Sequence, residues 1–276
     1  MAASGGAASR ESLAEATDAL DALVDRSSAA DLGTLADQLA SVAVVLDGQA
    51  ALRRSLADPG AEPARREALF ERIFGGRLDV RALELLRPLV RDRWSSSVDL
   101  VDAVEVLSRR AALGVAERSG TLDDVEDQLF RFGRILDAEP LLRQTLEERA
   151  ASGERRTELL DRLIGARVDP TTRRLLVQAV SAPRGRTLDR AIEELVQLAA
   201  ARRERYVAYV TAAAPLTPAQ ESRLTAALAR IYGRAVSLRV DVDPDLLGGL
   251  VVRVNDEVID GSVLSRLSGL RQRLAG

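Results

Sequence analysis

Apolar residues recur every three or four positions through roughly the first 200 residues, the spacing of one face of an α-helix. These stripes cover residues 13–23, 32–46, 52–56, 67–74 and 80–90, with a longer one from residue 98. Asp31 stands just before the second stripe and is expected to cap its helix, and Asp79 is expected to do the same before residues 80–90. Pro88 should bend or shorten that helix. The pattern predicts an N-terminal part built only from helices.

The helical part repeats itself. When the chain is shifted by 90 residues without a gap, residues 46–99 align with residues 136–189. The matches include the turn glycines Gly75 and Gly165 and the capping residues Asp79 and Asp169, as well as common apolar positions. Two unrelated helix arrays could look alike, but the register here never slips. We therefore predict two copies of one helical bundle, at residues 1–114 and 115–205.

The pattern changes near residue 206. Residues 206–214 are rich in strand formers, residues 217–220 form a capping box that opens a helix, and residues 236–242 alternate between apolar and polar. The apolar residues 250–254 and 258–259 flank an Asn255-Asp256 turn, which predicts a hairpin. Ser262 is expected to cap a last helix. Residues 206–276 thus predict a small α/β domain whose first two strands are parallel.

The predicted fold class is therefore mainly α: two tandem N-terminal helical bundles followed by a small α/β C-terminal domain. Composition narrows the chemistry of this fold. The chain has no His and no Cys, and all 39 of its basic residues are Arg. These absences exclude zinc fingers, Cys or His nucleophiles, Schiff-base lysines and Walker-A phosphate loops. We expect no catalytic residues, no metal and no cofactor.

Charge and hydropathy also limit the partners. The formal net charge is −3 and aromatic residues make up 3% of the chain, so neither a basic stripe nor a base-stacking surface for nucleic acid is expected. The Arg doublets alternate with acids, as on solvated helix faces. No apolar run approaches the roughly 20 residues of a membrane span, and no signal peptide is recognisable. We expect a soluble cytoplasmic protein that does not insert into a membrane.

The C-terminal run carries a resemblance. Residues 247–263, continuing into Leu267 and Leu270, resemble the C-terminal signature of the delta subunit of F-type ATP synthases, the family of the mitochondrial oligomycin-sensitivity-conferring protein. The order of elements from residue 187 onward is also similar. The family usually has Gly at the position of Asn255 and an aromatic residue in its first helix, where this chain has none. Members of the family are usually shorter by roughly the length of one bundle, and the second bundle accounts for this difference. A duplicated bundle is associated with high-GC Gram-positive bacteria.

The resemblance implies a stator subunit on the cytoplasmic face of the cell membrane. Its bundle would bind the amphipathic N-terminus of an alpha subunit beside a neighbouring beta subunit, and its C-terminal domain would hold the b subunit of the peripheral stalk. The alpha-binding groove would lie between the first and fifth helices, at Leu13, Ala16, Leu20, Leu85, Leu86 and Leu89. The b-docking and signature residues would be Gly248, Gly249, Arg253, Asn255, Asp256, Asp260, Gly261, Ser262, Leu267 and Leu270.

Other readings stay open at this point. The six groove residues could be ordinary core residues, and the sequence does not say which bundle copy binds alpha. A helical-repeat adaptor of another cytoplasmic complex would share the bundles, but it gives no reason for the C-terminal signature. An acid–base enzyme would have to use carboxylates such as Asp256 and Asp260, which flank a turn where acids are ordinary solvent residues.

Overall fold

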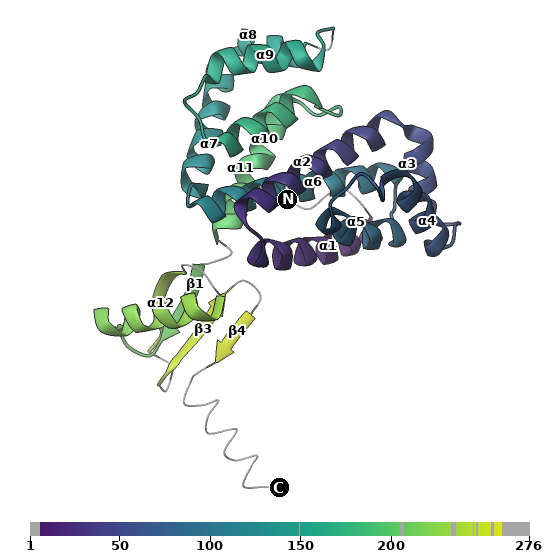
Figure 1. Cartoon of the computed structure of the whole chain (residues 1–276). Helices are drawn as coiled ribbons and strands as arrows, with labels where there is room; N and C mark the ends of the chain where they lie inside the picture. The colour runs from purple at the N-terminus through teal and green to yellow at the C-terminus, as the bar shows by residue number, and fades with distance from the viewer. Residues whose placement is uncertain are drawn as a thin grey trace. The chain divides into compact units, whose positions relative to one another are not determined.

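The computed structural model describes residues 6–148, 150–204, 207–232, 236–244, 246, 248–254 and 257–260. The chain divides into two compact units, Met1–Ala199 and Ala200–Gly276 (Figure 1). The helices before the sheet are α1 (Ala7–Arg26), α2 (Ala29–Gly48), α3 (Ala50–Leu56), α4 (Pro63–Phe74), α5 (Val80–Arg91), α6 (Ser97–Ser119), α7 (Leu122–Ala138), α8 (Pro140–Glu147), α9 (Gly153–Ile164), α10 (Pro170–Ser181) and α11 (Leu188–Glu204).

The helices of the first unit repeat with the period of the sequence. Shifting α4 and α5 by 90 residues gives the bounds of α9 and α10, and α3 shifted in the same way covers all but the last residue of α8. Side-chain contacts repeat too. The backbone N–H of Asp79 donates to Oε1 of Gln38 over 2.9 Å, and that of Asp169 donates to Oε1 of Gln128 over 2.8 Å. The two copies therefore share the contact that fixes the start of α5 and of α10.

The two copies are packed around one helix. Helix α6 contacts α1, α2, α3 and α5, and it also contacts α7 and α10. Most of its residues are buried, including Leu100, Val104, Leu107 and Leu113. Side chains from both copies form a single continuous hydrophobic cluster. The N-terminal part is therefore one body with an internal repeat, built on a helix that belongs to both halves.

Within the described residues, the predicted helix starts agree with the structure except at one cap, and the last helix predicted after Ser262 lies outside those residues. Asp79 caps α5 by accepting from the backbone N–H of Arg81 over 2.9 Å, as expected. The cap of α2 is Ser28 rather than Asp31. Asp31 lies three residues further on and completes a capping box with Ser28, because the hydroxyl and the carboxylate each accept from the other's backbone N–H. Pro88 lies inside α5, which still continues to Arg91.

The apolar composition of α2 is explained by its position in the structure. By length and composition alone, this helix is apolar enough to cross a membrane. Seven of its residues are buried in the core of the first unit, among them Leu32, Leu35 and Leu39, and its main contact is with α6. Packing inside the protein thus accounts for its apolar stripe.

The second unit contains a four-stranded mixed sheet. Its elements are β1 (Val207–Ala212), α12 (Pro218–Tyr232), β2 (Ser237–Val242), β3 (Leu250–Val254) and β4 (Glu257–Asp260). The strand order is β2-β1-β3-β4, with β1 and β2 parallel and the other neighbours antiparallel. A capping box opens α12, where the backbone N–H of Thr217 donates to Oε1 of Gln220 over 2.8 Å. The predicted parallel pair, hairpin and mainly α fold class are confirmed.

Candidate interaction surfaces

One face of the sheet is closed by the core of the second unit. Strands β1 and β3 turn Ala208, Val210, Val252 and Val254 inward, where they pack with Leu228 of α12. At the end of α12, the hydroxyl of Tyr232 donates to the carboxylate of Glu257 on β4 over 2.8 Å. Burial and this carboxylate together raise the pKa of Tyr232 to about 12.

The opposite face carries a row of side chains across all four strands. Strand register places Tyr209 beside Arg239 on one side and beside Arg253 on the other, and Arg253 lies beside Val258. The guanidinium of Arg239 lies 5.7 Å from the centre of the Tyr209 ring, within the range of a cation–π contact. The Tyr209 side chain is 39% exposed. A second row on the same face, two residues away along each strand, contains Asp241, Thr211, Val251 and Asp260.

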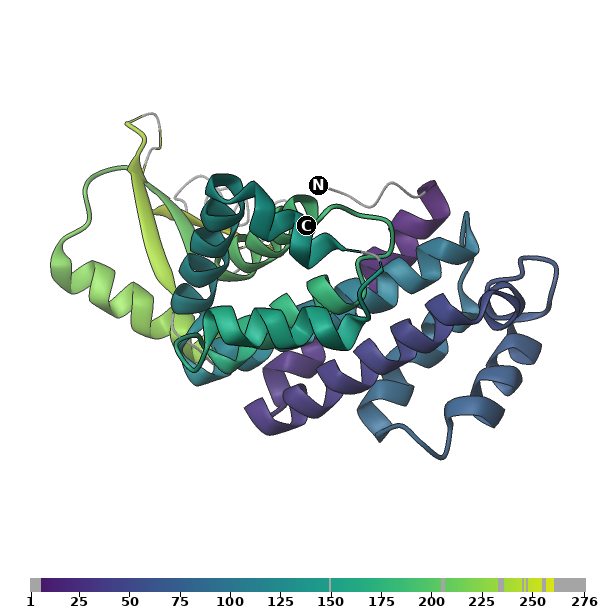
Figure 2. The ribbon, with the colours of Figure 1, turned by 90° about the horizontal axis from the view of Figure 1, so that it is seen from above.

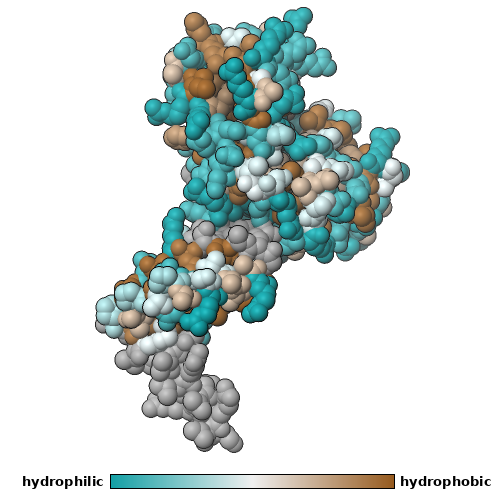
Figure 3. Space-filling model, turned by 60° about the vertical axis from the view of Figure 1, so that its left-hand side comes forward, coloured by the Kyte–Doolittle hydropathy of each residue, from teal (hydrophilic) through white to brown (hydrophobic). Residues whose placement is uncertain are grey.

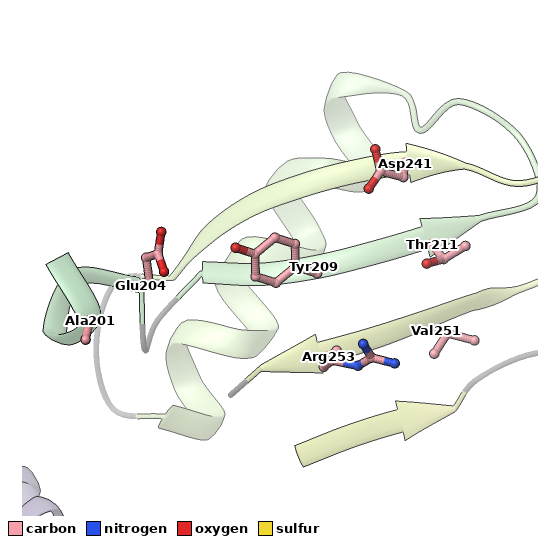
Figure 4. A pocket seen from close by; sticks show the side chains of 7 residues that line it. All are labelled: Ala201, Glu204, Tyr209, Thr211, Asp241, Val251 and Arg253. Atoms are coloured by element: carbon pink, nitrogen blue, oxygen red, sulfur yellow. The ribbon is translucent and has the colours of Figure 1, made fainter. Parts of the chain in front are cut away.

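A cleft of about 610 Å³ lies on this open face (Figure 4). Its lining residues are Ala201, Glu204, Tyr209, Thr211, Asp241, Val251 and Arg253. The set combines two acids, one Arg, one Tyr and small or apolar groups, without a nucleophile held by a base. Tyr and Arg are the residue types that most often dominate the energy of protein–protein contacts. This face is therefore suited to docking a partner.

The signature residues fall partly within the described part of the chain. Gly248 and Gly249 have φ of 136° and 84°, values that glycine adopts freely, and they lead into β3 as the sequence indicates. Arg253 lies in the exposed row described above, and Asp260 is exposed at the end of β4. Asn255, Asp256, Gly261, Ser262, Leu267 and Leu270 lie outside the described residues. The docking role of all ten stays a prediction.

The six predicted groove residues lie on α1 and α5, two helices that contact each other. Ala16, Leu20, Leu85, Leu86 and Leu89 are buried in the core of the first unit, and Leu13 is half-buried. They would therefore form the floor between the two helices, while outward residues such as Asp18 and Glu84 would meet a partner first. Their binding role stays a prediction.

A buried charge cluster joins α6 to α11 and to the segment before it. Arg109 on α6 pairs with Glu105 on the same helix and with Glu194 on α11, at 2.6 and 3.6 Å. Glu105 also accepts from Arg184, over 2.8 Å, and from Arg186, both in the connection between α10 and α11. We call Glu105, Arg109, Arg184, Arg186 and Glu194 the junction cluster.

The ionisation of the junction cluster follows from its neighbours. Burial alone would raise the pKa of Glu105, but Arg109, Arg186 and Arg184 outweigh it and hold that pKa below its ordinary value. Arg184 also pairs with Asp102 over 2.7 Å, and burial raises the pKa of Asp102. Among the described residues, no group of three or more His, Cys, Asp or Glu side chains could hold a metal ion.

Neither the junction cluster nor the open-face surface at Tyr209, Arg239 and Asp241 was predicted from the sequence. The polar positions of β2 alternate with apolar ones, so the sequence did contain a signal for an outward face. It contained no comparable signal for the cluster, because Glu105 and Arg109 have the ordinary spacing of an exposed ion pair on a helix.

Comparison with known proteins identifies the family. The model of the ATP synthase delta (OSCP) subunit family matches residues 109–274. ATP synthase subunit delta of Streptomyces avermitilis is 50% identical over 268 residues, covering 97% of this chain and 98% of the relative. The subunits of Streptomyces griseus subsp. griseus and Acidothermus cellulolyticus are 49% and 47% identical, over 98% and 97% of this chain and 99% and 98% of theirs.

A chain in the cryo-EM structure of the Toxoplasma gondii mitochondrial ATP synthase hexamer is 22% identical, with a TM-score of 0.33, and covers 61% of this chain and 96% of its own. That similarity is too low to define the fold. The bacterial relatives, in contrast, align along nearly the whole length, through both helical copies and the sheet. The chain therefore belongs to the ATP synthase delta (OSCP) subunit family.

Proposed function

We propose that this chain is a non-catalytic subunit of the peripheral stalk of an F-type, proton-translocating ATP synthase. It would link the catalytic head to the b stalk on the cytoplasmic face of the cell membrane and resist the torque of the rotor. The observation that carries the proposal is the full-length identity of about half the residues with proteins named ATP synthase subunit delta.

The two units would hold the two ends of this link. The first unit would bind the N-terminal segment of an alpha subunit next to a neighbouring beta subunit, through the α1 and α5 surface. The second unit would bind the b subunit through the open sheet face around Tyr209 and Arg253. Two docking modules on one chain make the second contact intramolecular, so modest individual affinities combine into a durable link.

The packing of the first unit supports this mechanical role. A stator has to transmit force without bending, and the helical copies share one continuous core across α6. The junction cluster adds ion pairs from α6 to α11 and to the connection before it. No step of the proposed role needs a cofactor, a metal or nucleic acid.

Reconstitution tests the proposal. Membranes that contain the ATP synthase of the same organism are stripped of this chain and then supplied with the purified protein. We expect ATP-driven proton pumping to fall on stripping and to recover on addition, while the stripped heads still hydrolyse ATP. Pumping that is unchanged by stripping and by addition would reject a stator role.

A further inference from the structure

The outward sides of the matching helices α5 and α10 differ in what covers them. On α5 of the first copy, Glu84 and Pro88 are exposed, and the Glu84 side chain keeps 57% of its surface. Ninety residues further on, Arg174 and Gln178 occupy the same places on α10. The Arg174 side chain keeps only 28% of its surface, and Gln178 is half-buried.

The difference in exposure between matching residues is larger for helices α1 and α6. Shifted by 90 residues, α1 falls on α6, which contacts α10 as α1 contacts α5. Ala14 and Asp18 are exposed on α1, whereas Val104 and Ser108 are 1% and 0% exposed on α6. The surface that is open in the first copy is thus closed in the second.

The closing element is α2, which belongs to the first copy. Asp37 of α2 pairs with Arg174, with Nε 2.9 Å from the carboxylate. The hydroxyl of Ser108 donates to the backbone carbonyl of Ala36 over 2.8 Å and accepts from the amide of Gln178 over 3.1 Å. Helices α2 and α10 run beside each other in both ribbon views (Figures 1 and 2).

Arg174 also approaches the backbone of α2 at Gly33. Gly33 lies on α2 one turn before Asp37, and a Cβ at Gly33 would be 3.7 Å from the Arg174 guanidinium, an ordinary contact distance. The sequence of α2 is therefore compatible with its place over the second copy.

The α1 side of the open surface is acidic. Glu11, Glu15 and Asp18 are exposed on α1, and no basic residue lies between Arg10 and Arg26. Half-buried Leu13 adds an apolar group at the edge. Such a surface fits an amphipathic helix whose apolar strip is flanked by basic side chains.

On this basis we propose that each chain offers one helix-binding surface, on α1 and α5, and that α2 fills its counterpart on α6 and α10. The partner is an amphipathic helix with basic flanks. The inference rests on the proposed function, which supplies the N-terminal segment of alpha as the partner. The family model begins at residue 109, so the covered copy is the one that this chain shares with the family model.

Calorimetry with the full chain and a synthetic peptide of the alpha N-terminal segment tests the stoichiometry. We expect one peptide per chain, and we expect the double change Glu15→Arg and Asp18→Arg to weaken binding about tenfold or more. The matched control is Glu158→Arg on α9, an exposed acid away from both surfaces, which should bind normally. Two peptides per chain, or one with unchanged affinity in the double variant, would overturn the inference but leave the proposed function standing. A folded chain that binds no peptide would reject the proposed alpha contact itself.

Local labels then identify the copy that binds. The chain has no cysteine, so one introduced cysteine carries a single fluorophore. A label at Ala14→Cys on α1 should respond to the peptide, and a label at Arg173→Cys, on the exposed side of α10, should not. The reverse response would place the site on the second copy and overturn the inference.

Discussion

Glu105 and Arg109 lie one turn apart on α6, with a carboxylate oxygen 2.6 Å from a guanidinium nitrogen and side chains only 9% and 1% exposed. The same spacing on α9 gives the pair Glu158 and Arg162, whose side chains are 67% and 78% exposed. Water screens the second pair but not the first. Two identical sequence spacings therefore produce interactions of very different energy.

Replacing Glu105 by Gln should destabilise the chain by about 3–5 kcal/mol, because the change leaves the buried Arg109 and its neighbouring guanidinium groups without their shared carboxylate. Chemical denaturation followed by circular dichroism measures this loss. The matched variant Glu158→Gln should leave the denaturation midpoint nearly unchanged. Equal effects of the two changes would show that the junction cluster does not act as a buried network.

The same carboxylate predicts a pH dependence. The pKa of Glu105 is lower in the folded chain than its ordinary value of 4.5. Its stabilisation is therefore complete above that ordinary value and is lost as the pH falls through the folded pKa. We expect the stability of the natural chain to fall more steeply in acid than that of Glu105→Gln. Parallel acid limbs in the two proteins would contradict this assignment.

Arg184 combines ion pairs with an uncommon backbone conformation. Its φ is 48°, in the left-handed region that favours glycine, while its side chain pairs with Asp47, Asp102 and Glu105. Both Arg184→Ala and Arg184→Gly remove the ion pairs, but only Gly relieves the backbone. We expect the Ala variant to be less stable than the Gly variant by about 1 kcal/mol, measured by denaturation. A Gly variant that is the less stable of the two would rule out this backbone cost.

Substitutions of Leu20 and Leu13, both on α1, should affect folding and binding differently. Leu20 is fully buried, so Leu20→Ala should cost about 2–5 kcal/mol of stability. Leu13 is only packed against the edge of the core, so Leu13→Ala should cost less and should act mainly on the affinity for the alpha peptide. Denaturation and calorimetry on both variants check this division. A Leu13→Ala chain with normal affinity would remove that residue from the binding surface.

The open sheet face should bind the b subunit without contributing much to folding. The double change Tyr209→Ser and Arg253→Ala removes an exposed ring and an exposed charge. We expect binding of b to fall about tenfold or more, with a small change in the denaturation midpoint. The control is Arg223→Ala on α12, which is exposed outside the cleft lining and should bind b as the natural chain does. Unchanged binding in the double variant would move the b contact to another part of the second unit.

Periodicity and caps were sufficient to predict the helices, the sheet strands and the repeat. Gly75, Asp79 and their partners 90 residues later mark turns whose geometry is local, so the sequence alone could locate them. The N-cap of α2 was predicted at Asp31, but the structure places it at Ser28. Both residue types cap helices, and only the backbone geometry separates them.

Surfaces were harder to predict than elements. Whether Leu20 or Leu86 lines a groove or fills a core depends on which helices meet, and spacing does not specify that. The burial of Val104 and Ser108 likewise depends on a contact between α2 and α6, two elements that are far apart in the chain. The exposed apolar residues of the second copy include Phe130, Ile135, Leu141 and Leu163, and Figure 3 shows brown groups among the hydrophilic ones there. Phe130 and Ile135 lie off the buried stripe of α7, which runs through Leu122, Val125, Leu129, Phe132 and Leu136.

The central position of α6 limits how this protein can change its length. Each residue of an α-helix advances the direction of the side chains by about 100°. One residue inserted in the middle of α6 would turn the residues after it by that angle relative to the residues before it. The ion pair of Asp102 with Arg184, before the insertion, and the hydrogen bond from Arg118 to the backbone carbonyl of Val24, after it, could then not form together. We therefore expect insertions and deletions among natural relatives to concentrate in the loops, with the length of α6 held constant.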